Sequence, residues 1–376
     1  MPIRILHAHS TFSLGGKEAR AVRLMNAWGD AAHHVILSGM PGQFGARDAI
    51  APGIHAGFPD DAPSLTGRFG LDRLFRLARY MRGFDLVLTY NWGAFDAVMA
   101  RYLFRGPPLV HHEDGFNEDE ADGLKTGRNL YRRLGLSAAH RLVVPSRRLE
   151  AIAATAWGQG AGRIARISNG IPLARFDAPP EPDAIPGLRR SDGELVVGTV
   201  AGLRKIKNLP RLVRAFAQLG DRRAQLVVVG EGPERDAIGA EAARLGIADR
   251  VHLPGFLPEP ARYLGLFDIF ALSSDSEQFP ISLVEAMAAG LPAVTTDVGD
   301  IASMIADENR AFITPLDEEP AFVAALQRLA GDPQLRARIG AANRAKARAE
   351  YDEAAMIRCY AQLYGGAIGR PDAFPS

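Results

Sequence analysis

The alternation of short apolar segments with longer amphipathic segments constrains the fold of this chain most strongly. Six short segments rich in Val, Ile and Leu occur between residues 3 and 168, and helical patterns separate them. A second series of six runs from residue 195 to residue 313. Continuous apolar strands joined through helices are typical of parallel sheets that are covered on both faces. Two such series predict two doubly wound α/β domains, which suits a length of 376 residues.

The expected strands alternate with helices throughout both halves. They cover residues 3–7, 34–38, 85–90, 109–112, 141–145 and 164–168, and then 195–200, 225–229, 251–253, 269–272, 293–296 and 311–313. Between the two series, the segment Ala178–Asp183 is polar and rich in proline, so it cannot continue a sheet. We therefore expect an N-terminal domain over residues 1–175 and a C-terminal domain over residues 176–351.

Charge and composition exclude several classes of protein. The formal net charge of +1 argues against general binding to nucleic acid. Cys359 is the only cysteine, so no internal disulfide forms and we expect a cytoplasmic location. No apolar run approaches the roughly 20 residues that span a bilayer, and the first residues have a strand pattern rather than that of a signal peptide. Residues 1–175 carry 22 Lys and Arg against 15 Asp and Glu, which favours an anionic partner there.

Glycine turns follow strands in both halves. Gly15 and Gly16 precede a predicted helix, where a glycine backbone can approach a ligand and free N–H groups can bind phosphate. The dinucleotide motif Gly-x-Gly-x-x-Gly is absent at this position, and a tight turn explains the pair as well. Gly230 lies in a similar turn after a strand of the second half, and a structural role explains it.

Cations and carboxylates follow two strands of the second half. Arg204 and Lys207 are suited to a diphosphate, the first through its planar fork and the second as a point charge, although a solvated loop is the ordinary alternative. Glu277 lies on a loop, and Glu285 follows eight residues later in an apolar helix, where an unpaired carboxylate is rare. Because carboxylates accept hydrogen bonds from sugar hydroxyls, this pair predicts a site for two sugar rings of one ligand.

The order of these motifs resembles glycosyltransferase family 4, a family of retaining enzymes with the GT-B fold. The resemblance covers nearly the full chain and is most specific from Glu277 through Glu285 to Ala-Met-Ala-Ala-Gly-Leu-Pro. The other matching motifs are Gly15-Gly16-Lys17-Glu18, Val144-Pro145-Ser146, Ser168-Asn169-Gly170-Ile171, Arg204-x-x-Lys207-Asn208, Gly230-x-Gly-Pro233 and Val251-x-Leu-x-Gly255. It implies two Rossmann-like domains that face across a cleft, with a C-terminal helix at about residues 352–376 that returns to the first domain.

The resemblance also implies a nucleotide-diphosphate sugar donor, which is bound mainly by the second domain. UDP is the expected nucleotide because it is frequent in the family. The implied contacts are the diphosphate with Arg204 and Lys207, the ribose with Glu285, the transferred sugar with Glu277, donor oxygens with the backbone of Phe279, Pro280 and Ile281, the base near Leu253 and Gly230, and phosphate with Gly15 and Gly16.

Two positions depart from the family pattern. Gly202 stands where many relatives carry an arginine, and Arg204 would take over its role. Relatives often place a histidine at a strand end near the anomeric carbon, and two registers put either His112 or Asp114 there. The resemblance implies that this pair binds the sugar and stabilises oxocarbenium charge. Simple packing of His112 at the strand end is the alternative.

The resemblance implies front-face transfer with retention, in which the leaving diphosphate takes the acceptor's proton. The expected catalytic residues are His112, Asp114, Glu277 and Lys207. No Asp-x-Asp triplet for a divalent ion occurs, so we expect no metal and no cofactor. A nucleotide-sugar epimerase of the same fold and a non-enzymatic sugar-nucleotide binder are alternatives. A further alternative is a metal-dependent hydrolase that would use His7, His9 and His112.

The acceptor is expected to be a saccharide or a lipid-linked saccharide, by analogy with the family alone. The segment Arg68–Arg82 predicts a basic amphipathic helix, with Leu71, Leu74, Phe75 and Ala78 on its apolar side. Such a helix suits the surface of an anionic membrane. It equally suits an ordinary helix whose apolar stripe faces the sheet. We expect the apolar side to face inward and the arginines to be available for contact with the inner face of the membrane.

Overall fold

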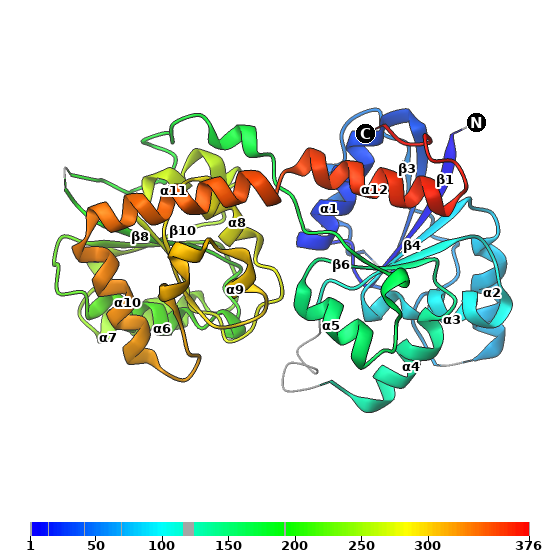
Figure 1. The fold of residues 1–376 in the computed structure, drawn as a ribbon, viewed down its shortest axis with the longest axis horizontal. Coiled ribbons are helices and arrows are strands. Elements are labelled where there is room, and N and C mark those ends of the chain that lie inside the picture. The colour runs from blue at the N-terminus through cyan, green and yellow to red at the C-terminus, as the bar shows by residue number, and fades with distance from the viewer. Residues whose placement is uncertain are drawn as a thin grey trace. The chain divides into compact units, whose positions relative to one another are not determined.

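The computed structural model describes residues 2–13, 15–40, 42–68, 70–115, 124–191 and 193–375. Contacts divide the chain into unit 1, Met1–Asn169 with Ala354–Ser376, and unit 2, Gly170–Glu353 (Figure 1). This division differs from the expected boundaries because Ile171 and Phe176 are buried in the core of unit 2. Ile171 also forms a β-bridge with Asp352, which keeps residues 352 and 353 in the same unit. The proline-rich segment 178–183 consequently lies inside unit 2 rather than between the units.

Unit 1 contains a parallel seven-stranded sheet in the order β3-β2-β1-β4-β5-β6-β7. Its strands are β1 (Ile3–His9), β2 (Ala32–Ser38), β3 (Ala56–Gly57), β4 (Leu86–Tyr90), β5 (Leu109–His112), β6 (Arg141–Val144) and β7 (Ile164–Arg166). Every residue of β4 and β5 is buried, as a sheet covered on both faces requires. The strand order reverses between β1 and β4, and ligands of open α/β sheets bind at such a switch point.

Helices cover both faces of this sheet (Figure 1). They are α1 (Gly16–Trp28), α2 (Leu71–Met81), α3 (Phe95–Phe104), α4 (Thr126–Leu136), α5 (Arg147–Thr155) and α12 (Glu353–Ala367). One apolar core joins the sheet to α2, α3, α4 and α5, and a second core joins its other face to α1 and α12. The C-terminal helix therefore packs on unit 1, as the resemblance implied, with Tyr364 against Trp28 at a ring distance of 5.5 Å.

Unit 2 contains a parallel six-stranded sheet in the order β10-β9-β8-β11-β12-β13. Its strands are β8 (Val196–Val200), β9 (Gln225–Val229), β10 (Val251–Gly255), β11 (Ile269–Leu272), β12 (Ala293–Thr296) and β13 (Ile313–Thr314). Its helices are α6 (Leu209–Ala217), α7 (Arg235–Arg244), α8 (Ile281–Ala288), α9 (Ile301–Met304), α10 (Glu319–Gly331) and α11 (Pro333–Glu350). Helices α6, α7 and α10 contribute to one core, and α8 and α9 contribute to the other. The switch point lies between β8 and β11.

Within the part of the chain that the structure describes, none of the helices is both long enough and apolar enough to span a bilayer.

Candidate active site

The unit 2 site lies at the switch point of the second sheet. Lys207 ends the short helical turn Lys205–Lys207 after β8, and Glu277 lies on the loop after β11. The Nζ atom of Lys207 lies 2.5 Å from Oε1 of Glu277, and the hydroxyl of Ser274 donates to the same oxygen at 2.7 Å. The two side chains expose only 15% and 9% of their surface. The sheet thus joins a cation and a carboxylate that are far apart in the sequence.

Further expected residues of unit 2 lie in and just before helix α8 and on the loop after β8. Glu285 lies in α8, and the helix begins at Ile281 with Phe279 and Pro280 just before it. Pro280 carries no amide hydrogen, so of the three expected backbone donors only Phe279 and Ile281 can serve. The Arg204 side chain is exposed, and its Nε atom lies 3.8 Å from where a side chain at Gly202 would begin. The Arg204 side chain therefore passes close to position 202, where many relatives carry an arginine.

Gly230 has a structural role. Its φ of 139° is outside the usual range of L side chains, and a Cβ there would stand 1.9 Å from the carbonyl oxygen of Ala201. Its N–H donates to the carbonyl of Gly255 at 2.9 Å, so it joins the loops after β8 and β9 to the last residue of β10. Leu253 lies in the neighbouring strand β10, and its carbonyl oxygen accepts from Arg235 at 2.6 Å. Both residues lie on the β9–β10 side of the switch point.

The unit 1 site also lies at the carboxyl edge of its sheet. Gly15 caps α1 in an extended conformation, and both Gly15 and Gly16 are exposed. Asp114 follows β5, and its two carboxylate oxygens pair with the guanidinium of Arg20, the Nη2–Oδ2 distance being 2.8 Å. Arg20 is 3% exposed, whereas the Asp114 side chain is 13% exposed. Burial alone would raise the pKa of Asp114, but the charge and hydrogen bonds of Arg20 lower it, so Asp114 is ionised.

His112 lies in a different environment from Asp114. Its Nδ1 atom lies 3.1 Å from the carbonyl oxygen of Thr89, which can only accept, so Nδ1 carries the proton. Its Nε2 atom lies 2.6 Å from the hydroxyl of Tyr364 and accepts from it. Burial, followed by the charge of Arg20, lowers the pKa of His112 to about 3. His112 is therefore a neutral, buried support for the strand end, and Asp114 is the member of the pair that reaches the surface.

Three buried histidines of strands β1 and β2 lie near His112 in unit 1. His7 bonds to Tyr90 and to His34 at 3.2 and 3.0 Å, and His9 stacks on Tyr90 with ring centres 3.9 Å apart. We call these residues the histidine cluster: His7, His9, His34 and His112. Burial is the main cause that lowers the pKa of each, to about 4 for His34 and to about 3 for His112.

The histidine cluster does not have the geometry of a metal site. His7 uses both ring nitrogens within the protein, as does His112. In the described ranges, no group of three His, Cys, Asp or Glu side chains is arranged to hold a metal ion. The metal-dependent hydrolase that uses His7, His9 and His112 is therefore not supported by the positions of these residues.

Sequence reasoning missed Arg20, which holds Asp114 and also donates to the side chain of Asn169 at 2.9 Å. A signal was available, because an arginine between Ala19 and Ala21 on a predicted core-facing helix needs a buried partner. Asn91 was also missed. It has a φ of 56°, and its side chain accepts from the backbone N–H of Asp114 at 2.8 Å. Positive φ at a residue other than glycine often marks a functional loop.

Two family models match the chain. The model described as Glycosyltransferase Family 4 matches residues 4–175, and the model described as Glycosyl transferases group 1 matches residues 181–346. The two matches together take in most of both units. The chain belongs to glycosyltransferase family 4.

Several relatives are similar to the chain in sequence. N-acetyl-alpha-D-glucosaminyl L-malate synthase of Bacillus anthracis is 28% identical over 46% of this chain and 46% of its own length. D-inositol 3-phosphate glycosyltransferase of Nocardia farcinica is 28% identical over 78% of this chain and 69% of its own length. The matches to three of the relatives span about half of those proteins' length.

Solved structures resemble the whole chain. HepE from Anabaena, in complex with UDP, has a TM-score of 0.79 and 20% identity, and the match covers 97% of this chain and 100% of HepE. Sucrose-phosphate synthase from Thermosynechococcus elongatus has a TM-score of 0.78 and 21% identity, and the match covers 97% of this chain and 99% of that one. These likenesses confirm the expected GT-B fold.

Proposed function

We propose that this protein is a retaining glycosyltransferase that uses a nucleotide-diphosphate sugar, preferably a UDP-sugar, without a metal ion. The observation that carries this proposal is the contact of Lys207 with Glu277 at the switch point of unit 2. A cation suited to a diphosphate and a carboxylate suited to sugar hydroxyls are then joined by one hydrogen bond. Membership of the family and the UDP complex of HepE support the choice of donor.

The proposed reaction is a front-face displacement. The bond from the anomeric carbon to the diphosphate breaks, a bond from the acceptor oxygen forms on the same face, and the acceptor's proton passes to the departing phosphate oxygen. Lys207 and Arg204 stabilise the charge that develops on the diphosphate, and Glu277 holds the sugar hydroxyls. Glu285 binds the ribose, and Phe279 and Ile281 donate N–H groups to donor oxygens.

Unit 1 contributes the acceptor side in this proposal. In this reaction the ionised Asp114 stabilises the positive charge of the oxocarbenium-like sugar, and Arg20 fixes both of its carboxylate oxygens. Gly15 and Gly16, at the start of α1, contribute backbone N–H groups to phosphate binding. His112 fixes the end of β5 through its two hydrogen bonds, to Thr89 and to Tyr364.

A transfer assay tests the proposal. The purified protein is incubated with a chelator, a panel of UDP-, GDP- and ADP-sugars, and a panel of saccharides and membrane lipid extract as acceptors. We expect one donor to release its nucleoside diphosphate in an acceptor-dependent way, with Lys207→Ala and Glu285→Gln much slower. Release only with added divalent ion contradicts the metal-free proposal. Conversion of the donor sugar without acceptor identifies an epimerase instead.

We further propose that unit 1 contacts an anionic membrane through helices α2, α3 and α4. The structure corrects the expected burial of α2, because Leu71 and Phe75 are 61% and 44% exposed while Leu74 and Ala78 are buried. Adjacent helices add four more exposed residues, which are Tyr102, Leu103, Leu130 and Leu134. The three helices carry seven arginines, of which Arg132 is fully buried, and two aspartates, and exposed apolar groups beside the other arginines suit anionic headgroups. Phe69 of the expected segment lies outside the described residues.

Vesicle sedimentation tests this contact. We expect wild-type protein to sediment with phosphatidylglycerol vesicles and not with phosphatidylcholine vesicles. Leu71→Ser combined with Phe75→Ser removes only exposed side chains, so the fold should persist while binding falls by roughly tenfold or more. Equal sedimentation of this variant and the wild type contradicts the proposal.

A further inference from the structure

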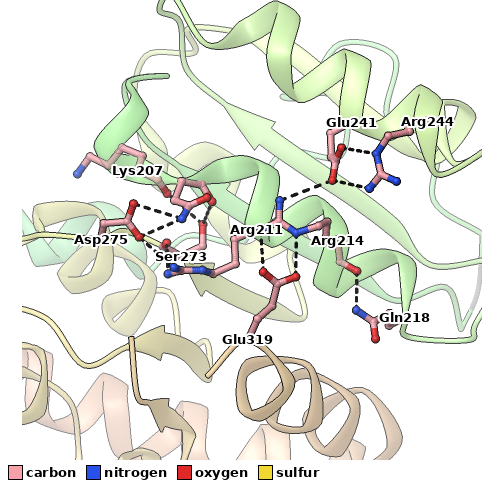
Figure 2. A network of polar contacts seen from close by, with 10 residues as sticks. Lys207, Arg211, Arg214, Gln218, Glu241, Arg244, Ser273, Asp275 and Glu319 are labelled. Atoms are coloured by element: carbon pink, nitrogen blue, oxygen red, sulfur yellow. Dashed lines mark hydrogen bonds and ion pairs between the residues drawn. The ribbon is translucent and has the colours of Figure 1, made fainter. Parts of the chain in front are cut away.

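A group of polar contacts joins the two loops that carry Lys207 and Glu277 (Figure 2). The backbone N–H of Asp275 donates to the carbonyl of Ile206 at 2.8 Å. The hydroxyl of Ser273 lies 3.1 and 3.0 Å from the carbonyl oxygens of Lys207 and Asn208. Backbone groups of the lysine loop are thus bonded directly to the loop after β11.

Asn208 gives the lysine loop its turn. Its φ and ψ of 42° and 47° are left-handed, a conformation that asparagine tolerates better than most residues other than glycine. Its side-chain amide donates to both carboxylate oxygens of Asp275, at 3.0 and 3.2 Å. The residue directly after Lys207 is therefore held in an unusual conformation by Asp275.

Arg211 completes the group from helix α6. Its Nη2 atom lies 3.0 Å from Oδ1 of Asp275, and its Nη1 atom donates to the carbonyl of Ser273 at 3.2 Å. The Arg211 side chain is 12% exposed and the Asp275 side chain is 41% exposed, so the guanidinium is mostly buried while water reaches part of the carboxylate. We call Asn208, Arg211, Ser273 and Asp275 the Asp275 clamp. In Figure 2 the Lys207 side chain extends away from the clamp.

We propose that Asp275 and Asn208 are positioning residues for the diphosphate, acting through Lys207. This inference rests on the proposed function, because it assumes that Lys207 binds the donor. The clamp fixes the lysine loop against the Glu277 loop, so the ammonium and the carboxylate occupy set places before a ligand arrives. Binding then costs less ordering of the long, flexible lysine side chain.

The charge of Asp275 makes the inference testable. Asp275 is an anion close to a site proposed for an anion, so by charge alone its removal strengthens diphosphate binding. If Asp275 positions Lys207, its removal weakens diphosphate binding instead. The two roles therefore predict opposite signs for the same substitution.

The experiment measures calorimetric binding of UDP and UMP to wild type, Asp275→Ala and Asp275→Asn, with GDP and ADP as the alternative probes. We expect Asp275→Ala to bind UDP about five- to tenfold more weakly and UMP within about twofold of wild type. Asp275→Asn retains an acceptor for Asn208 and should recover most of the loss. In a Lys207→Ala background, Asp275→Ala should have no further effect on UDP.

A second pair of variants separates the backbone from the side-chain contact. Asn208→Gly permits the left-handed conformation, whereas Asn208→Ala opposes it and loses the same amide, so the alanine variant should bind UDP more weakly. Glu319→Gln is the matched control, because Glu319 pairs at 2.6 Å with Arg214, which lies on α6 like Arg211 but does not contact the lysine loop. We expect this control to bind UDP like wild type. Hydrogen exchange of residues 203–210 should rise in Asp275→Ala and stay unchanged in Glu319→Gln.

Several results overturn the inference. If Asp275→Ala binds UDP as tightly as wild type or more tightly, the inference is wrong, because Asp275 then has only an electrostatic effect. Equal losses for UDP and UMP indicate general damage rather than positioning. Unchanged hydrogen exchange in Asp275→Ala shows that no clamp exists. If wild type binds none of the three diphosphates, the proposed function fails together with the inference, whereas normal wild-type binding with an unaffected variant removes the inference alone.

Discussion

Glu277→Gln separates two effects of one carboxylate. In the ligand-free protein, Glu277 holds the ammonium of Lys207 at 2.5 Å, with 15% of the lysine and 9% of the glutamate side chain exposed. A pair so shielded is worth about 1.5–3 kcal/mol, rather than the roughly 0–1 kcal/mol of a surface pair. A neutral glutamine still accepts a hydrogen bond from the ammonium but lacks the opposite charge, so it holds Lys207 more weakly by about 1–1.5 kcal/mol.

The difference predicts the size of the change in nucleotide affinity. UDP carries no sugar, so it must compete with Glu277 for Lys207 without gaining the hydroxyl contacts of Glu277. Loss of the carboxylate charge should release about 1–1.5 kcal/mol and tighten UDP binding by about tenfold. Sugar transfer by the same variant should fall, because the transferred sugar loses a charged partner.

Calorimetry with UDP and a transfer assay with the sugar nucleotide measure the two effects. Ser274→Ala is the control, because Ser274 donates to the same oxygen of Glu277 but carries no charge, and we expect UDP affinity to stay within about twofold. If Glu277→Gln weakens UDP binding as Lys207→Ala does, the reasoning is refuted. Glu277 would then help Lys207 to bind phosphate instead of competing for it.

Three other predictions concern the stability of the two units and the ion pair of Arg20 with Asp114. Acid should destabilise unit 1, because the histidine cluster stays neutral in the folded protein while the same histidines protonate below about pH 6.5 in the unfolded chain. The free energy of unfolding should therefore fall as the pH drops towards 4, by about 2 kcal/mol per histidine at pH 5. Thermal melts from pH 7 to pH 5 check this, and a flat profile would contradict it. Gly340→Ala in α11 should lower the free energy of unfolding by about 1–3 kcal/mol in denaturant titrations, because the new Cβ would stand 1.9 Å from the carbonyl oxygen of Gly290. Gly239→Ala in α7 is the control: its Cβ meets nothing within 4 Å, so it should raise the free energy of unfolding by about 0.5–1 kcal/mol. Arg20→Gln should raise the pKa of Asp114 and slow transfer by about 10- to 100-fold, and an unchanged pH–rate profile would deny this role to Arg20.

The sequence predicted the fold well because its signal is local. Continuous apolar strands such as β4 and β11 are buried at every residue, so their composition alone marks them. Strand β3 spans only Ala56–Gly57, too short for any periodicity, and it was missed. The change of unit at Gly170 was also missed, because it depends on the pairing of Ile171 with Asp352 across a long stretch of chain.

The candidate site was predicted as separate motifs rather than as contacts. The sheet order brings Lys207 to Glu277 and Arg20 to Asp114, and no spacing along the sequence encodes either pair. The different surroundings of His112 and Asp114 likewise needed the structure, since only burial and hydrogen bonds distinguish two polar residues at one strand end. The exposure of Leu71 and Phe75 depends on the position of neighbouring helices, which an amphipathic pattern does not specify.

The central claim is that unit 2 binds a nucleotide diphosphate through Lys207 and Glu285 without a metal ion. Calorimetry of UDP, GDP and ADP with the wild type, Lys207→Ala and Glu285→Ala, all in the presence of a chelator, tests it most directly. We predict that one nucleotide binds the wild type and that each substitution weakens it by about tenfold or more. Binding that needs a divalent ion, or that neither substitution weakens, would contradict the account.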